Sequence, residues 1–124
     1  MMNLDGQVAI ITGGAQGIGE GASEIFCQAG AKVIIWDVID DKPNTTRNGK
    51  KGSQIFFQKV DITLRNQIEN AVAEIMTKYG RIDILINNAG IIRDKSFLKM
   101  TDEEWHNVLN VNLTGAFNTC KVVI

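Results

Sequence analysis

The chain has 124 residues, a hydrophobic fraction of 44%, a charged fraction of 22% and a formal net charge of −1. These values predict one packed globular domain over residues 1–124 and exclude a disordered chain. They also argue against nucleic acid and membranes as partners, because no basic block stands out and the apolar runs are far shorter than the roughly 20 residues that span a bilayer.

The first part of the chain predicts two buried strands around one helix. Residues 8–11 are a β-branched run that ends at Thr12, and residues 32–36 are a second run that ends at Asp37. Continuous apolar runs of this length are typical of strands buried on both faces. Between them, apolar residues recur at helical spacing up to Gly30, a natural C-terminal stop. The predicted apolar face of this helix consists of Ile18, Ala22, Ile25, Phe26 and Ala29.

The middle of the chain continues the alternation. Residues 38–53 are polar and predict a loop with one helical turn. Residues 54–60 predict a third strand and residues 82–86 a fourth. A second helix between these strands ends at Gly80. Its predicted apolar face consists of Ile68, Val72, Ile75, Met76 and Tyr79.

A third helix is predicted after the fourth strand. Thr101 and Glu104 form a capping box, in which the threonine oxygen caps a free N–H and the glutamate reaches back, so the helix starts near Asp102. Its predicted apolar side carries Trp105, Val108, Leu109 and Phe117.

This order of elements predicts an α/β fold. Strands that alternate with helices indicate a parallel sheet with right-handed crossovers, and hence a Rossmann-type, doubly wound, three-layer architecture. Four strands wound consecutively give the order 3-2-1-4, an incomplete Rossmann sheet. The winding reverses between the first and fourth strands, and ligands bind in the crevice at such a reversal.

The loop after the first strand carries the pattern of a dinucleotide site. Gly13 allows a tight turn, Gly17 allows close approach of a pyrophosphate, and Gly19 allows the helix to pack closely on the strand. The helix N-terminus offers free N–H donors to phosphates, so Gln16 and Ile18 are candidate cofactor contacts too. A glycine-rich turn that merely closes a corner is the weaker interpretation.

Two aspartates at strand ends extend this site. Asp37 ends the second strand, where a carboxylate can accept both hydroxyls of an adenine ribose and would repel a 2′-phosphate, so NAD is favoured over NADP. Asp61 and Ile62 end the third strand, where they could contact the adenine. An equally weighted alternative is that this segment caps the following helix.

The two cysteines and the histidine suggest no metal site. Cys27 and Cys120 lie far apart without a C-x-x-C motif, and no spacing brings them to His106 and a fourth ligand. We interpret them as reduced thiols in helices. Together with an N-terminus unlike a signal peptide, they predict a cytoplasmic protein.

Three motifs in order give the chain a family resemblance. The glycine loop is followed by Asn-Asn-Ala-Gly at 87–90 and Asn-Leu-Thr-Gly at 112–115. This pattern resembles the short-chain dehydrogenase/reductase family over essentially the whole chain. Within it, Arg93-Asp94, Met100-Thr101 and Glu104-Trp105 are similar to reductases of 3-oxoacyl-(acyl-carrier-protein) and acetoacetyl-CoA.

The resemblance implies a role for individual residues. Gly13, Gly17 and Gly19 would hold the pyrophosphate and Asp37 the adenosine ribose. Asn88, Ala89 and Gly90 would lie along the cofactor and brace the central strand. Asn112 would belong to the Asn-Ser-Tyr-Lys tetrad and position a water in a proton relay; the alternative is that it braces a helix kink. The implied reaction is hydride transfer between a nicotinamide and a carbonyl or hydroxyl substrate, a small molecule or acyl thioester, in a homodimer or homotetramer.

The sequence also departs from the family. Its single tyrosine, Tyr79, is followed four residues later by Asp83, so no Tyr-x-x-x-Lys exists, and no serine-bearing fifth strand follows. We therefore expect a truncated chain that is inactive alone. Gln16 in the glycine loop, where many acyl-carrier-protein reductases have a basic residue, together with Asp37, weakens an assignment to fatty-acid synthesis. Two alternatives stay open: a non-catalytic NAD-sensing module, and a half-sheet that folds only by pairing.

Overall fold

A computed structural model describes residues 3–39, 54–90 and 99–124 and shows a four-stranded parallel sheet. The strand order is β3-β2-β1-β4, which confirms the predicted order 3-2-1-4. Trp36 lies beside Thr12 on one side and Gln58 on the other, so the carboxyl ends of the three strands meet at one edge. The strands are β1 (Val8–Thr12), β2 (Lys32–Asp37), β3 (Ile55–Lys59) and β4 (Ile84–Ile86).

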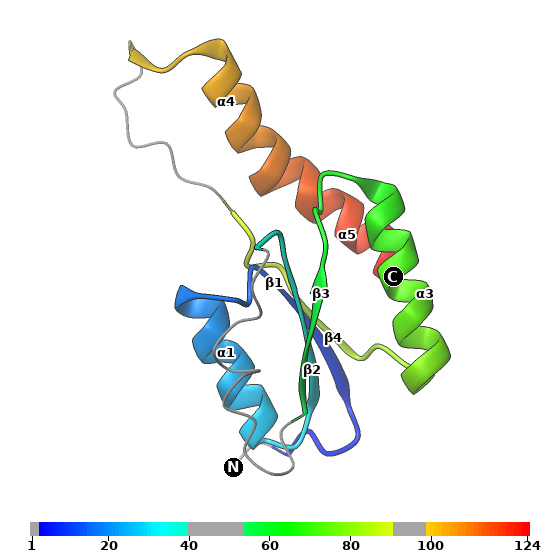
Figure 1. Cartoon of the computed structure of the whole chain (residues 1–124). Helices are drawn as coiled ribbons and strands as arrows, with labels where there is room; N and C mark the ends of the chain where they lie inside the picture. The colour runs from blue at the N-terminus through cyan, green and yellow to red at the C-terminus, as the bar shows by residue number, and fades with distance from the viewer. Residues whose placement is uncertain (1–2, 40–53, 91–98) are drawn as a thin grey trace.

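The helices lie on both faces of the sheet, which confirms the three layers (Figure 1). Helix α1 (Gly17–Gln28) covers one face, whereas α3 (Arg65–Tyr79) and α5 (Gly115–Val123) lie side by side on the other. Helix α4 (Asp102–Leu109) projects beyond the strand ends and joins α5 through a π-helical segment, η2 (Asn110–Thr114). In the described ranges, no helix has both the length and the apolar character to cross a bilayer.

The central strands are buried on both faces, as their unbroken apolar sequence predicts. The core divides into two clusters, one on each side of the sheet, and neighbouring residues of β1 and β2 alternate between them. Ile10 and Ile34 belong to the cluster under α3, whereas Ile11 and Ile35 belong to the cluster under α1.

The predicted apolar face of α1 is partly wrong. Ile18 is 84% exposed and Ile25 is also exposed, whereas the buried positions are Gly19 and Ser23. Small residues face inward because the start of the helix lies directly against the glycine loop. The Ser23 hydroxyl donates to the Gly19 carbonyl at 2.8 Å, so this polar side chain is satisfied within the helix.

The third helix also differs from its prediction. It begins at Asp102 as expected, and Thr101 accepts a hydrogen bond from the Glu104 N–H at 3.1 Å, but the π-helical segment interrupts it. Trp105 and Phe117 are 50% and 57% exposed rather than buried. The buried residues of α5 are instead small and polar, Gly115, Asn118 and Thr119, and Val122 and Val123 pack against the core partly buried.

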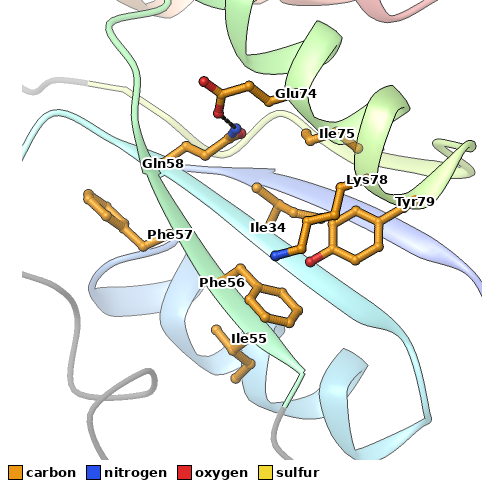
Figure 2. Close-up of a pocket in the computed structure, with 9 residues that line it drawn as sticks. All are labelled: Ile34, Ile55, Phe56, Phe57, Gln58, Glu74, Ile75, Lys78 and Tyr79. Atoms are coloured by element: carbon orange, nitrogen blue, oxygen red, sulfur yellow. Dashed lines mark hydrogen bonds between the residues drawn. The ribbon is translucent and has the colours of Figure 1, made fainter.

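Helix α3 packs on the outer strand through aromatic and amide side chains (Figure 2). Gln58 accepts from Trp36 Nε1 at 2.7 Å and donates to Glu74 at 2.9 Å, which links β2, β3 and α3. Lys78 lies over the rings of Phe56 and Tyr79 beside a hollow of about 350 Å³. Tyr79 packs against the core, as predicted, and Gly80 ends α3 in the left-handed conformation.

Two groups of predicted features lie outside the described residues. Most of the loop predicted at 38–53 falls in 40–53, and Arg93 and Asp94 fall in 91–98. The third and fourth strands are confirmed with shorter bounds than predicted. The thiols of Cys27 and Cys120 are free and lie in helices α1 and α5, as predicted.

Candidate functional site

A cavity of about 610 Å³ opens at the carboxyl edge of the sheet. It collects residues from the glycine loop, the ends of β2 and β3, the segment after β4, and the α4–η2 helix. Every cofactor-binding residue predicted from the sequence lines it except Gly19. These lining residues are Gly13, Gln16, Gly17, Ile18, Asp37, Asp61, Ile62, Asn88, Ala89 and Gly90.

The glycine loop has the geometry of a phosphate cradle. Gly13 and Gly17 have φ angles of +66° and +61°, which side chains rarely adopt. A Cβ at Gly13 would lie 2.9 Å from the Ala89 Cα, whereas space is open at Gly17. No side chain caps the N-terminus of α1 at Gln16, so its first N–H groups face this space uncapped.

Gly19 shapes the site without lining it. A Cβ there would collide with the Gly13 carbonyl oxygen and lie 2.5 Å from Asn88 Nδ2. The close contact is therefore with the loop and the segment after β4, and not with the strand as the sequence analysis expected. Gly19 lets α1 begin directly against the turn.

Asp37 lines the cavity at the end of β2. One carboxylate oxygen accepts from the Val38 N–H at 2.8 Å, and the other accepts from the Ala15 N–H at 3.3 Å. The side chain thus points back to the glycine loop from the end of β2. A ribose placed between loop and strand would meet both the aspartate and the loop backbone.

Asp61 serves the turn that begins α3. Its Oδ1 accepts from Thr63 N and Oγ1 at 2.9 and 2.6 Å, and its N–H donates to Gln67 Oε1 at 2.8 Å. These bonds order the turn before α3, and Gln67 ties the helix back to it, whereas no side chain caps the helix at Leu64. Because Asp61 and Ile62 also line the cavity, the adenine contact stays a prediction.

Thr12 organises the centre of the site, although the sequence analysis gave it no role. Its buried hydroxyl accepts from the N–H groups of Asn88 and Ala89, both at 3.0 Å, and donates to the Ile86 carbonyl at 3.3 Å. Asn88 Nδ2 donates to the Gly13 carbonyl at 3.1 Å. The segment after β4 is therefore tied to the end of β1 and to the glycine loop.

Asn112 lies in the π-helical segment, close to the segment after β4. A Cβ on Gly90 would be 3.2 Å from Asn112 Oδ1. Asn112 does not line the cavity, but its neighbours Asn110 and Val111 do, together with Asn107. These three were missed; their spacing of three to four residues, which puts them on one helical face, was the available signal.

The whole arrangement is matched by a family model. The model described as short chain dehydrogenase matches residues 7–124. The chain belongs to the short-chain dehydrogenase family. It is 40% identical to the 3-oxoacyl-[acyl-carrier-protein] reductase FabG of Thermotoga maritima, over 99% of this chain and 51% of that protein. It is 37% identical to the oxidoreductase UcpA of Salmonella typhimurium, over 100% of this chain and 48% of that protein.

Two solved structures superpose closely on this fold. A short-chain dehydrogenase/reductase from Burkholderia xenovorans superposes with a TM-score of 0.91 at 30% identity, covering 99% of this chain and 51% of that one. The protein named gox2181 gives a TM-score of 0.90 at 35% identity, covering 98% and 48%. This family member therefore spans about half the length of the relatives it matches, and their family supports an oxidoreductase.

Proposed function

We propose that this chain binds NAD(H) in the cavity at the carboxyl edge of the sheet, as the cofactor-binding part of an oxidoreductase. The observation that carries the proposal is the convergence of the open, uncapped glycine loop, Asp37 and the segment 88–90 on one cavity. A dinucleotide needs all three, because its phosphates, its adenosine ribose and its nicotinamide are chemically different and each requires its own contacts.

The residues present fit such a cofactor. Gly13 and Gly17 would admit the pyrophosphate, Asp37 would accept from the adenosine ribose, and Asn88 to Gly90 would lie along the nicotinamide half. When bound, the nicotinamide supplies or accepts a hydride. Asn112 beside Gly90 would hold a water in a proton relay.

The proposed substrate is a carbonyl or hydroxyl compound, in particular a 3-oxoacyl thioester. Several relatives are named 3-oxoacyl-[acyl-carrier-protein] reductase, which supports this class. Met100-Thr101 and Glu104-Trp105 carry the same similarity. The whole protein is proposed to be a homo-oligomer.

NAD is proposed over NADP because of charge. Among the described residues that line the cavity, two are acidic, Asp37 and Asp61, and none is basic. A 2′-phosphate at the adenosine ribose would therefore meet a carboxylate without a neutralising cation.

The test is a titration of wild type and Asp37→Asn with NADH and NADPH by calorimetry. Wild type should prefer NADH, and Asp37→Asn should lose about tenfold or more of that preference, because one charge repulsion and one ribose acceptor are removed. Asp102→Asn, an exposed carboxylate on α4, is the matched control and should keep it. Equal wild-type affinities, or a preference for NADPH, would refute the assignment of Asp37.

A further inference from the structure

A buried amide on α5 holds one wall of the cavity. Asn118 is 8% exposed; its Nδ2 donates to the Ile62 carbonyl at 3.3 Å, and its Oδ1 accepts from Arg65 Nη2 at 3.1 Å. A guanidinium only donates and a carbonyl only accepts, so a single orientation of the amide satisfies both partners. Asn118 therefore fixes the backbone at Ile62 from the side of α5.

The Ile62 side chain is fixed by the same helix. A Cβ at Gly115 would lie 2.6 Å from Ile62 Cδ1, so the glycine leaves a notch that the isoleucine fills. Ile62 lines the cavity, whereas Asn118, Gly115 and Arg65 do not. Helix α5, which lies alongside α3 (Figure 1), thus sets the position of a cavity wall from behind.

We propose that Asn118, oriented by Arg65, is a positioning residue for the adenine end of the dinucleotide. This inference rests on the proposed function and on the sequence-based prediction that adenine lies against Asp61 and Ile62, which both line the cavity. Without Asn118, the Ile62 carbonyl would lose a buried donor, and the segment would shift toward water to recover one. That shift would move the adenine wall and leave the glycine loop in place.

The experiment compares Asn118→Leu with Thr119→Val in dissociation constants for NADH and its hypoxanthine analogue, which replaces the adenine amino group by a carbonyl. The Thr119 hydroxyl is buried but donates within α5, to Gly115, so its removal is the matched control. Wild type and Thr119→Val should prefer NADH equally. Asn118→Leu should bind NADH about tenfold more weakly and lose the preference, because one buried hydrogen bond is removed on each side of the amide.

Arg65→Gln, at an exposed position, should weaken NADH binding and reduce the preference for NADH as Asn118→Leu does, but by a smaller factor. It decides the question if Asn118→Leu does not fold. An unchanged preference in the folded variant would overturn the role of Asn118 and leave the proposed function standing. A lower melting temperature of Asn118→Leu with unchanged dissociation constants would overturn the role of Asn118 in the same way. A folded wild-type chain that binds no NADH would overturn the proposed function and this inference together.

Discussion

Gly19 shows how a residue can shape a cavity that it does not line. Its α-carbon lies where the first turn of α1 meets the Gly13 carbonyl and the Asn88 side-chain amide. There is no room at this point for the β-carbon of an alanine. Any added carbon must therefore separate the helix N-terminus from the loop. Since the N–H groups of that helix are the proposed phosphate donors, their geometry depends on this contact.

We expect Gly19→Ala to lose dinucleotide binding by tenfold or more and to lower stability by about 1–3 kcal/mol, the usual cost of overpacking. Gly21→Ala is the control, because space is open at that position of the same helix. It should stabilise the chain by about 0.5–1 kcal/mol through helix propensity and leave binding unchanged. Calorimetry measures the change in binding and thermal unfolding the change in stability. Normal NADH binding by Gly19→Ala would refute the proposal that the glycine loop binds the phosphates.

Site residues were predictable where they belong to a motif with local spacing. Gly13 and Gly17 follow β1 at fixed positions and Asp37 ends β2, so the local sequence around each strand end was enough to predict that they line the cavity. Thr12 and Asn118 were missed because their partners are 76 and 56 residues away in the sequence. A hydroxyl or amide of that kind carries no sign of its partner until the fold brings the two together.

At the scale of elements, the strands were easier to predict than the faces of the helices. A strand buried on both sides needs only an unbroken apolar run, which β1 and β2 have. The rotation of a helix depends on what it packs against, and both α1 and α5 turn small residues inward, Gly19 and Gly115 among them. Periodicity of large apolar residues therefore gave a face that is only partly right: in α1, Ala22 and Phe26 pack against the core, whereas Ile18 and Ile25 are exposed.

The start of β4 is held to β1 by a charged cluster. Asp83 accepts from the Val8 N–H at 2.8 Å and from two nitrogens of Arg81 at 2.8 and 2.7 Å. The hydrogen bond from Arg81, and then the one from Val8, lowers the pKa of Asp83 below its ordinary value of 3.8. A lowered pKa in the folded state means that the carboxylate form stabilises the fold.

This contribution is present above pH 3.8 and is lost as the pH falls through the lower folded-state pKa. Asp83→Asn should therefore lower the melting temperature at pH 7, and the gap to wild type should narrow progressively below about pH 4. Thermal unfolding from pH 7 to pH 2 measures it, with Glu24→Gln on α1 as an exposed control. A gap that stays constant across this range would contradict the role of the charge.

At the scale of the whole molecule, the position of the site follows from the strand order, because the winding of the sheet reverses between β1 and β4. Consecutive winding predicted the order β3-β2-β1-β4 because right-handed crossovers leave few alternatives. The chain, which spans about half of a relative's length, forms the cavity to which we assign the cofactor. Residues 1–124 contain no Tyr-x-x-x-Lys pair, which the sequence analysis expects the reaction to need.

We therefore expect no measurable reductase activity from the 124-residue species alone. A positioned general acid contributes about 10²- to 10⁴-fold, and Asn112 is a neutral amide that does not donate a proton at pH 7. NADH oxidation with acetoacetyl-CoA is the measurement, on protein whose mass has been verified, with the full-length Thermotoga maritima reductase as positive control. Turnover at an ordinary enzymatic rate would contradict this prediction.

The most direct test of dinucleotide binding uses Trp36, which lines the cavity. The chain has two tryptophans, so Trp105→Phe on exposed α4 leaves Trp36 as the only one. The reduced nicotinamide absorbs where tryptophan emits, so NADH bound in the cavity should quench Trp36 with a saturable, single-site curve. The same titration of Trp105→Phe combined with Gly19→Ala should show only the linear loss caused by absorption. A linear curve from the folded Trp105→Phe chain would contradict the proposed site.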